Sequence, residues 1–173
     1  MIILEGADLV GKSTLAAKLC HKLSKPYEHL GPLPPDFHTY WSYMLLMKNE
    51  PVMDRFHWSE WAYSYARQDE TRQSIYEKKL VEAALHELGA VSVLVRTNWD
   101  NIRARYDDKE MYDIPTIQRA YAWFEMHQSE FDVVINAQPY PTTQDCDLIV
   151  EKYRSVQEER RNLINSQKIY IHN

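Results

Sequence analysis

The stretch Gly6–Thr14, GADLVGKST, directly follows the short apolar segment IILE at Ile2–Glu5. It fits the pattern G-x-x-x-x-G-K-[ST], and we call it the glycine loop. The β-branched segment before it and the helically spaced apolar residues after it predict a strand, a tight turn and a helix. Two glycines allow the backbone to curl so that successive N–H groups point inward, and the helix N-terminus adds positive potential. The pattern therefore predicts a cradle for phosphate groups.

The residues of the glycine loop have separate expected roles. Gly6 and Gly11 shape the turn, and Lys12 reaches the β- and γ-phosphates of a bound nucleotide. The Ser13 hydroxyl joins the coordination shell of Mg²⁺, and Thr14 completes the expected nucleotide-binding set. The loop thus predicts ATP and Mg²⁺ as cofactors. The alternative is a tight strand-to-helix turn that binds no ligand.

Three further charged residues extend this prediction. Asp54 ends the short apolar segment PVMD, and Arg55 follows it. A carboxylate at a strand end can hold Mg²⁺ through water, and an adjacent arginine can bind a second phosphate with two hydrogen bonds. The alternative is an ordinary ion pair at a strand end. Asp8, inside the glycine loop, is unusual beside phosphates, and is either a hydrogen-bonded turn residue or a contact to a sugar hydroxyl or a cation.

Strand and helix patterns alternate along the rest of the chain. Strands are predicted at residues 2–5, 51–54, 91–95 and 132–136, and helices at 15–23, 39–48, 80–88, 113–124 and 143–163, with another beginning at 59. The segment 27–37 is predicted to be a loop, and the tail KIYIHN is typical of either a strand or a flexible end. Short strands that are apolar on both faces predict an α/β fold with a parallel sheet between two layers of helices.

The length of 173 residues predicts a single domain over 1–173, and no run of 18 apolar residues suggests a membrane span. A formal net charge of −5 makes nucleic acid an unlikely partner, whereas a small nucleotide needs only a few well-placed cations. Cys20 and Cys146 are too isolated for a disulfide framework, and the first residues lack a secretory pattern, so a cytoplasmic location is expected. The oligomeric state stays open, with a homodimer among the alternatives.

The chain resembles the thymidylate kinase family of P-loop nucleoside monophosphate kinases, in the segments IILEGADLVGKST, DRFHWSEWAYSYA and RARYDD…IQRAY. The resemblance implies the P-loop kinase fold, a three-layer α/β/α arrangement with a five-stranded parallel sheet and a lid at about 97–113. It also implies that Asp54 assists the metal and that Arg55 clamps the acceptor phosphate. Asp8 would approach the sugar or phosphate of the acceptor.

Members of this family take a catalytic cation from either the glycine loop or the lid. The loop position after Asp8 is Leu9, which is not basic, so the resemblance makes Arg103 and Arg105 the expected catalytic donors, with Arg96 as a further candidate. The alternative for these arginines is a solvated helix face. On the next helix the family pattern implies a substrate-binding role for Tyr121, in the pair Arg119 and Tyr121.

The segment DFHTYWSYMLLMK departs from the family pattern. Phe37, Tyr40 and Trp41 offer ring faces on which a base can stack, and Tyr43 adds another. The arginine that would read the base in this segment is missing. We therefore expect base stacking to be kept and thymine specificity to be altered.

The residues and the resemblance together predict ATP- and Mg²⁺-dependent transfer of the γ-phosphoryl group to a deoxynucleoside monophosphate, with a pyrimidine base expected. The alternatives are a deoxynucleoside kinase that acts on a 5′-hydroxyl, a polynucleotide end kinase, and a nucleotide-binding regulator without activity. A hydroxyl acceptor needs a general base, for which Glu5, Asp8 and Glu60 are candidates.

Overall fold

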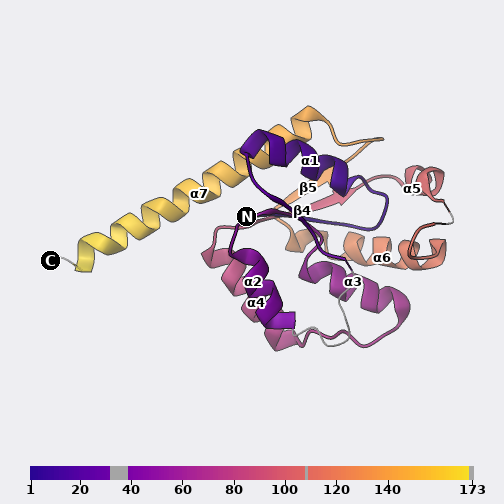
Figure 1. Cartoon of the computed structure of the whole chain (residues 1–173), viewed down its shortest axis with the longest axis horizontal. Helices are drawn as coiled ribbons and strands as arrows, with labels where there is room; N and C mark the ends of the chain where they lie inside the picture. The colour runs from indigo at the N-terminus through magenta and orange to yellow at the C-terminus, as the bar shows by residue number, and fades with distance from the viewer. Residues whose placement is uncertain (32–38, 108, 172–173) are drawn as a thin grey trace.

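The computed structural model describes residues 1–31, 39–107 and 109–171 (Figure 1). Five parallel strands form one sheet, in the order β2-β3-β1-β4-β5. The strands are β1 (Ile2–Glu5), β2 (Tyr27–His29), β3 (Val52–Asp54), β4 (Val91–Arg96) and β5 (Val133–Asn136). The helices are α1 (Lys12–Leu23), α2 (Thr39–Met47), α3 (His57–Arg67), α4 (Ile75–Glu87), α5 (Trp99–Arg105), α6 (Ile114–Met126) and α7 (Thr143–Ile171), with a 3₁₀ turn at Gln128–Glu130.

The central strands are apolar on both faces, and each face is covered by helices. Ile2 and Leu4 of β1 belong to the core beneath α1 and α7, while Ile3 between them belongs to the core beneath α2, α3 and α4. Figure 1 shows α1 and α7 on one side of the sheet and α2, α3 and α4 on the other. The prediction of a three-layer α/β/α fold with a five-stranded parallel sheet is confirmed.

The order of the strands determines where a ligand site can form in this sheet. β1 lies between β3 and β4, with Leu4 opposite Asp54 and Glu5 opposite Leu94. The helix after β1 covers one face of the sheet and the helix after β3 covers the other. Their connections diverge above the carboxyl ends of β1 and β3, where ligands bind in open α/β sheets.

Side-chain caps fix the starts of three helices. Ser74 and Glu77 form a reciprocal capping box at α4, Asn98 caps α5, and the Asp113 carboxylate accepts a hydrogen bond from Thr116 N at 2.9 Å. Each cap satisfies an N–H group that has no partner within its own helix. The cap at Asp113 confirms the helix start predicted at that residue.

Several predicted elements differ from the structure. The segment predicted as a loop contains β2, a short edge strand whose three residues Tyr27–His29 are all exposed. The final helix was predicted to end at Leu163, but α7 continues to Ile171, so the tail is helical and not a strand over residues 168–171. Helices α1, α3 and α4 begin at Lys12, His57 and Ile75, which lie three, two and five residues before the predicted starts.

The second half of α7 extends away from the sheet and its covering helices (Figure 1). None of the helices in the described ranges combines the length and apolar character that crossing a membrane requires.

Candidate active site

The glycine loop connects β1 to α1 through a backbone that glycine makes accessible. Gly6 has φ of 138°, and a Cβ atom added there would lie 2.2 Å from the Val95 carbonyl oxygen of the neighbouring strand. Gly11 has φ of 103°, and its added Cβ would lie 3.0 Å from Cδ of Pro141. Both glycines therefore allow a conformation and a close approach that other residues would strain.

Lys12 is the first residue of α1 and is 5 % exposed. Its Nζ donates hydrogen bonds to the carbonyl oxygens of Gly6 at 2.9 Å and Ala7 at 2.7 Å. Burial lowers the pKa of the Lys12 amine, and the charges of Asp54 and Glu5 oppose that shift. The side chain is thus folded back over the glycine loop, where the sequence predicts the phosphates.

Ser13 and Asp54 meet across the ends of α1 and β3. Ser13 Oγ donates to Asp54 Oδ2 at 2.6 Å, and the Tyr27 hydroxyl donates to the same oxygen at 3.1 Å. Asp54 is fully buried, and its Oδ1 has no hydrogen-bond partner among the described residues. His29 Nδ1 lies 3.6 Å from Asp54 Oδ2.

This oxygen set fits a magnesium ion. A hydroxyl, a carboxylate and phosphate oxygens are the ligands that Mg²⁺ takes together with water. Within the described residues there is no cluster of three or more His, Cys, Asp or Glu side chains that could hold a metal. A cation at Ser13 and Asp54 would therefore depend on a bound nucleotide to complete its coordination.

A cavity of about 350 Å³ opens in front of the glycine loop. We call it the loop cavity. Its wall comes from the glycine loop and α1, from the ends of β2 and β3, and from the segments after α5 and β5. The lining residues are Asp8, Leu9, Gly11, Lys12, Ser13, Thr14, His29, Asp54, Arg55, Arg105, Glu110 and Tyr140.

A second cavity, of about 280 Å³, lies beside α3. We call it the aromatic cavity, because four aromatic side chains line it together with several charged ones. The lining residues are Leu30, Gly31, Tyr43, Arg55, Phe56, Ser59, Glu60, Tyr63, Arg67, Asp69, Arg72 and Tyr112. Arg55 lines both cavities.

Arg55 is held between the two cavities by fixed partners. It is a non-glycine residue with φ of 70°, and its backbone N–H donates to the Leu4 carbonyl at 2.9 Å. Its guanidinium forms an ion pair with the Asp8 carboxylate and lies 5.5 Å from the centre of the Tyr63 ring. The Tyr63 hydroxyl in turn accepts from Asp8 N at 2.9 Å. These contacts connect the glycine loop directly to the aromatic cavity.

Glu5 lies beneath this arrangement and has no exposed surface. Its Oε1 accepts from the backbone N–H groups of Phe56 at 2.8 Å and Ser59 at 3.2 Å, and its Oε2 accepts from the Ser59 hydroxyl. Burial raises the pKa of the Glu5 carboxyl to about 7, although the three donors favour its charged form. Glu5 therefore fixes the turn that carries Arg55, and it is sealed from both cavities.

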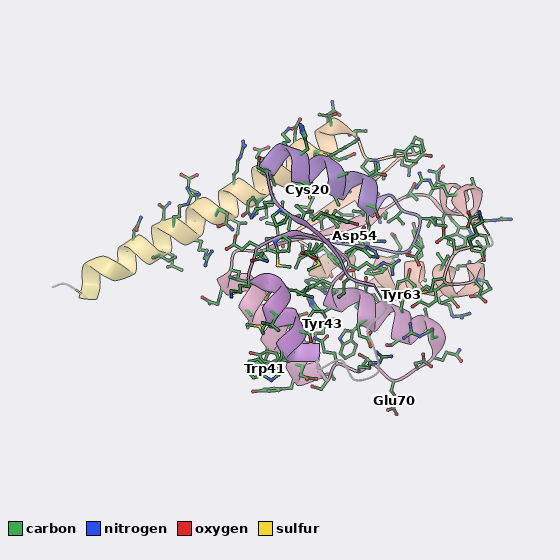
Figure 2. All side chains as sticks on the ribbon, viewed as in Figure 1. Cys20, Trp41, Tyr43, Asp54, Tyr63 and Glu70 are labelled. Carbon is green, nitrogen blue, oxygen red and sulfur yellow. The ribbon has the colours of Figure 1, made fainter. Side chains whose placement is uncertain are left out.

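The predicted base-stacking residues have different positions. Phe37 lies outside the described residues. Tyr40 and Trp41 form an edge-to-face pair on α2, and Trp41 is 69 % exposed. Neither lines the aromatic cavity, whereas the buried Tyr43 does. Figure 2 shows Trp41 at the periphery of the molecule and Tyr43 and Tyr63 farther inside.

The two lid arginines, Arg103 and Arg105, have different surroundings. Arg105 donates to the carbonyl oxygens of Leu9 and Pro139, lies 4.5 Å from the centre of the Tyr140 ring, and lines the loop cavity. Arg103, two residues earlier on α5, is exposed and lines neither cavity.

Two other candidates, Arg96 and Tyr121, make structural contacts. Arg96 pairs with Glu125 at 2.8 Å and bonds to Asn136, so it joins the ends of β4 and β5 to α6. The Tyr121 hydroxyl donates to the Thr97 carbonyl at 3.0 Å, and Tyr121 lines neither cavity. The structure thus brings Tyr121 to the connection after β4 and not to the predicted substrate site.

Sequence reasoning missed several residues that line the cavities. Arg67 and Arg72 supply positive charge to the aromatic cavity from the end of α3 and the segment that follows it. Tyr112 stacks on Tyr63 with ring centres 4.7 Å apart, and Tyr140 faces the loop cavity. No local motif marks these residues. The sequence signal that could have found them is an aromatic residue or an arginine near the end of a predicted helix, and this signal is weak.

Comparison with protein-family models gives no match, and comparison with curated proteins gives none either. Solved structures do match over nearly the whole chain. The YorR protein of Bacillus subtilis, solved in complex with phosphorylated GDP, has a TM-score of 0.67 at 19 % identity, covering 99 % of this chain and 98 % of YorR. Deoxyadenosine kinase of M. mycoides, with bound dCTP, has a TM-score of 0.50 at 15 % identity, covering 90 % of this chain and 100 % of the kinase.

At these identities the likeness concerns the fold. The chain has the P-loop kinase fold.

Proposed function

We propose that this chain transfers the γ-phosphoryl group of ATP to a deoxynucleoside monophosphate, in a reaction that depends on Mg²⁺, with a pyrimidine as the expected base. The observation that carries the proposal is the position of Arg55. It lines the loop cavity, where the glycine loop predicts a nucleotide triphosphate, and also the aromatic cavity, which offers rings and charges to a second ligand. A cation between two such cavities suits transfer of a phosphoryl group from one to the other.

The loop cavity is assigned to ATP. Lys12, Thr14 and the N–H groups at the start of α1 would hold the phosphates, while Ser13 and Asp54 would hold the metal. Bound Mg²⁺ supplies neutralisation of charge on the β- and γ-phosphates. Arg105 would support the nucleotide from the side of the lid.

The aromatic cavity is assigned to the acceptor. Arg55 would bind the acceptor phosphate, in exchange for part of its pairing with Asp8. Tyr112, which is partly exposed, offers its ring to the base, and the buried Tyr43 and Tyr63 form the wall behind it. Asp8, which lines the loop cavity and pairs with Arg55, would approach the sugar or phosphate of the acceptor where the two cavities meet at Arg55.

A monophosphate acceptor fits the site better than a free hydroxyl does. A phosphate is already an anion and needs no general base, whereas a hydroxyl has to lose its proton during transfer. Glu5 is sealed beneath the site, and Asp8 is paired with Arg55. Arg55, in contrast, is the kind of side chain that a phosphate group requires.

Two further parts of the proposal concern the chain as a whole. We propose that one domain spanning 1–173 carries both sites, and that the segment of about 97–113, which contains α5, acts as the lid. Cys20 and Cys146 are both free thiols, which suits a reducing compartment and supports a cytoplasmic location.

The test is a two-substrate assay with ATP and Mg²⁺ against deoxy and ribo monophosphates and the matching free nucleosides. We expect a diphosphate product from a deoxy monophosphate, and no product after chelation of Mg²⁺. In Arg55→Ala, the KM for the acceptor should rise about tenfold or more while ATP binding changes little, because Arg55 is assigned to the acceptor phosphate. Equal weakening of both ligands, in separate titrations, would contradict the acceptor clamp.

A deoxynucleoside kinase is the second candidate, and one observation favours it. Glu60 lines the aromatic cavity and is the remaining carboxylate from the candidate bases that could face a 5′-hydroxyl there. Deoxyadenosine kinase of M. mycoides shares the fold. In the same assay, a preference for free nucleosides that is lost in Glu60→Gln would replace the first proposal with this one.

A further inference from the structure

The aromatic cavity is lined by a second arginine, Arg67, which does not line the loop cavity. Arg67 is the last residue of α3, whereas Arg55 stands two residues before the start of that helix. The helix has 11 residues and therefore rises roughly 16 Å. Both arginines line the cavity, but only Arg55 also lines the loop cavity. A ligand with its phosphate at Arg55 thus has its far end near Arg67.

Arg67 is held in place by two partners. Its Nε donates to Asp69 Oδ2 at 2.7 Å, and its Nη1 donates to the Tyr112 hydroxyl at 3.1 Å. The guanidinium lies 5.9 Å from the centre of the Tyr112 ring, which is itself stacked on Tyr63. With Nε and Nη1 engaged in this way, Nη2 still carries two N–H donors on a rigid plane, and it has no partner among the described residues.

From this arrangement we infer that Arg67 selects the base of the acceptor, in favour of bases with an exocyclic carbonyl oxygen. This inference rests on the proposed function. A carbonyl such as O4 of uracil or thymine, or O6 of guanine, accepts a hydrogen bond from a guanidinium. The amino groups of cytosine and adenine occupy the same positions and are themselves donors. The fixed N–H donors of Arg67 therefore meet an acceptor in a base that carries the carbonyl oxygen, and another donor in a base that carries the amino group.

Asp69 positions Arg67 in this scheme and does not read the base itself. Its carboxylate binds Nε and so fixes the plane of the guanidinium. The Tyr112 hydroxyl, which accepts from Nη1, fixes the other side. A reader that is ordered before the ligand binds loses little side-chain entropy on binding, which strengthens discrimination.

The sharpest test compares deoxyuridine monophosphate with deoxycytidine monophosphate, because the two differ only at position 4 and at the adjacent ring nitrogen. Binding of each is measured by calorimetry and turnover by the coupled assay, in the full chain and in Arg67→Gln. The intact chain should prefer the carbonyl base about tenfold or more. In Arg67→Gln the ratio should fall towards one, because an amide offers both a donor and an acceptor.

Controls separate base reading from general damage. The ratio between two ligands cancels a uniform loss of folded protein, and Arg154→Gln, on the exposed side of α7, should leave it unchanged. Asp69→Asn should give an intermediate ratio, since it weakens the positioning of Arg67. Arg67→Lys should also lower the ratio, because a lysine keeps the charge but loses the planar fork.

The outcomes distinguish the inference from the function on which it rests. Transfer to both monophosphates at equal kcat/KM, or a ratio unchanged in Arg67→Gln, overturns the base reader and leaves the kinase proposal standing. Selective binding of the carbonyl base that is lost in Arg67→Gln, without any transfer, confirms the role of Arg67 and overturns the proposed reaction. A preference for the amino base overturns the reader in either case.

Discussion

The Ser13 hydroxyl and the Asp54 carboxylate are 2.6 Å apart, although 41 residues separate them in the sequence. The contact joins the first turn of α1 to the carboxyl end of β3. Because the unbonded Oδ1 of Asp54 is buried beside it, the pair presents oxygen atoms to one small volume in front of the glycine loop. In the proposed kinase, Ser13 and Asp54 would hold the cation here.

Asp54→Asn should weaken the use of magnesium more than it weakens the fold. The amide keeps the size of the side chain but removes its negative charge, so a hard cation loses a ligand that it prefers. We expect activity to fall by about 10²-fold or more, with the half-maximal Mg²⁺ concentration shifted upward. The measurement is a Mg²⁺ titration of turnover, with Glu28→Gln on the exposed strand β2 as the matched control. An unchanged Mg²⁺ midpoint in a folded Asp54→Asn protein would contradict the metal assignment.

Lys12→Ala should abolish transfer while the protein remains folded. The lysine is assigned to the phosphates, and loss of a cation that acts in the transition state costs on the order of 10²-fold or more in rate. Its two hydrogen bonds to carbonyl oxygens of the glycine loop are a smaller structural contribution. Turnover and thermal melting are measured beside Lys22→Ala, which removes an exposed lysine from the same helix. If the folded variant keeps more than a few per cent of the activity, the assignment of Lys12 to the phosphates is wrong.

The two lid arginines should differ in their effects. Arg105→Ala should slow turnover and also raise the KM for ATP, because Arg105 bonds to the Leu9 carbonyl and lines the loop cavity. Arg103→Ala should slow turnover with little change in ATP affinity, as expected for a donor that acts on lid closure. Steady-state kinetics at several ATP concentrations measure both effects. Wild-type turnover in both variants would exclude a catalytic cation from α5.

Gly6→Ala should destabilise the protein strongly. The new Cβ would lie 2.2 Å from the Val95 carbonyl oxygen, and φ of 138° is unfavourable for alanine. Strain and overpacking together predict a loss of about 3 kcal/mol or more in the free energy of unfolding. Gly31→Ala is the control, because a Cβ there meets nothing within 4 Å. The free energies of unfolding of the two variants, measured with urea, should differ by most of this amount. Equal values would mean that the glycine loop can shift away from β4.

Glu5→Gln should remove a pH dependence of stability. The pKa of Glu5 rises from 4.5 to about 7 on folding, so the folded state binds the proton more tightly than the unfolded state does. The free energy of unfolding therefore decreases as pH rises from about 4.5 to about 7, by on the order of 3 kcal/mol from this group. Glutamine keeps an acceptor for the Phe56 and Ser59 N–H groups and cannot ionise. Denaturant titrations at pH 5 and pH 8 should show a larger decrease for the wild type than for the variant.

The local parts of the site could be predicted from the sequence. The spacing of Gly6, Gly11 and Lys12 predicts the turn from a local pattern, and Asp54 ends an apolar segment that is typical of a buried strand. The structure agrees with both. In contrast, β2 has the sequence YEH, with no apolar alternation, because an exposed edge strand needs none. Its hydrogen bonding to β3 depends on the completed sheet.

The parts of the site that depend on distant contacts could not be predicted. Arg67 meets Tyr112 across 45 residues of sequence, and only the packing of α3 against α6 brings them to one cavity. The burial of Glu5 could not be predicted from the sequence either, because a glutamate at a strand end is also a suitable catalytic base. For Trp41 the sequence predicts a functional contact that the structure does not show. Its aromatic neighbours favour a stacking surface, but the orientation of α2 places Trp41 in solvent.

Arg55 contributes to the walls of two cavities, and this has a thermodynamic consequence for both ligands. Its guanidinium can be drawn towards one cavity only by changing what it offers to the other. A ligand that alters the position of Arg55 therefore changes the dissociation constant at the second cavity. Linkage requires the second ligand to change the first constant by the same factor. In the proposed kinase, the Asp8 carboxylate would contribute to that factor, because it pairs with the same guanidinium.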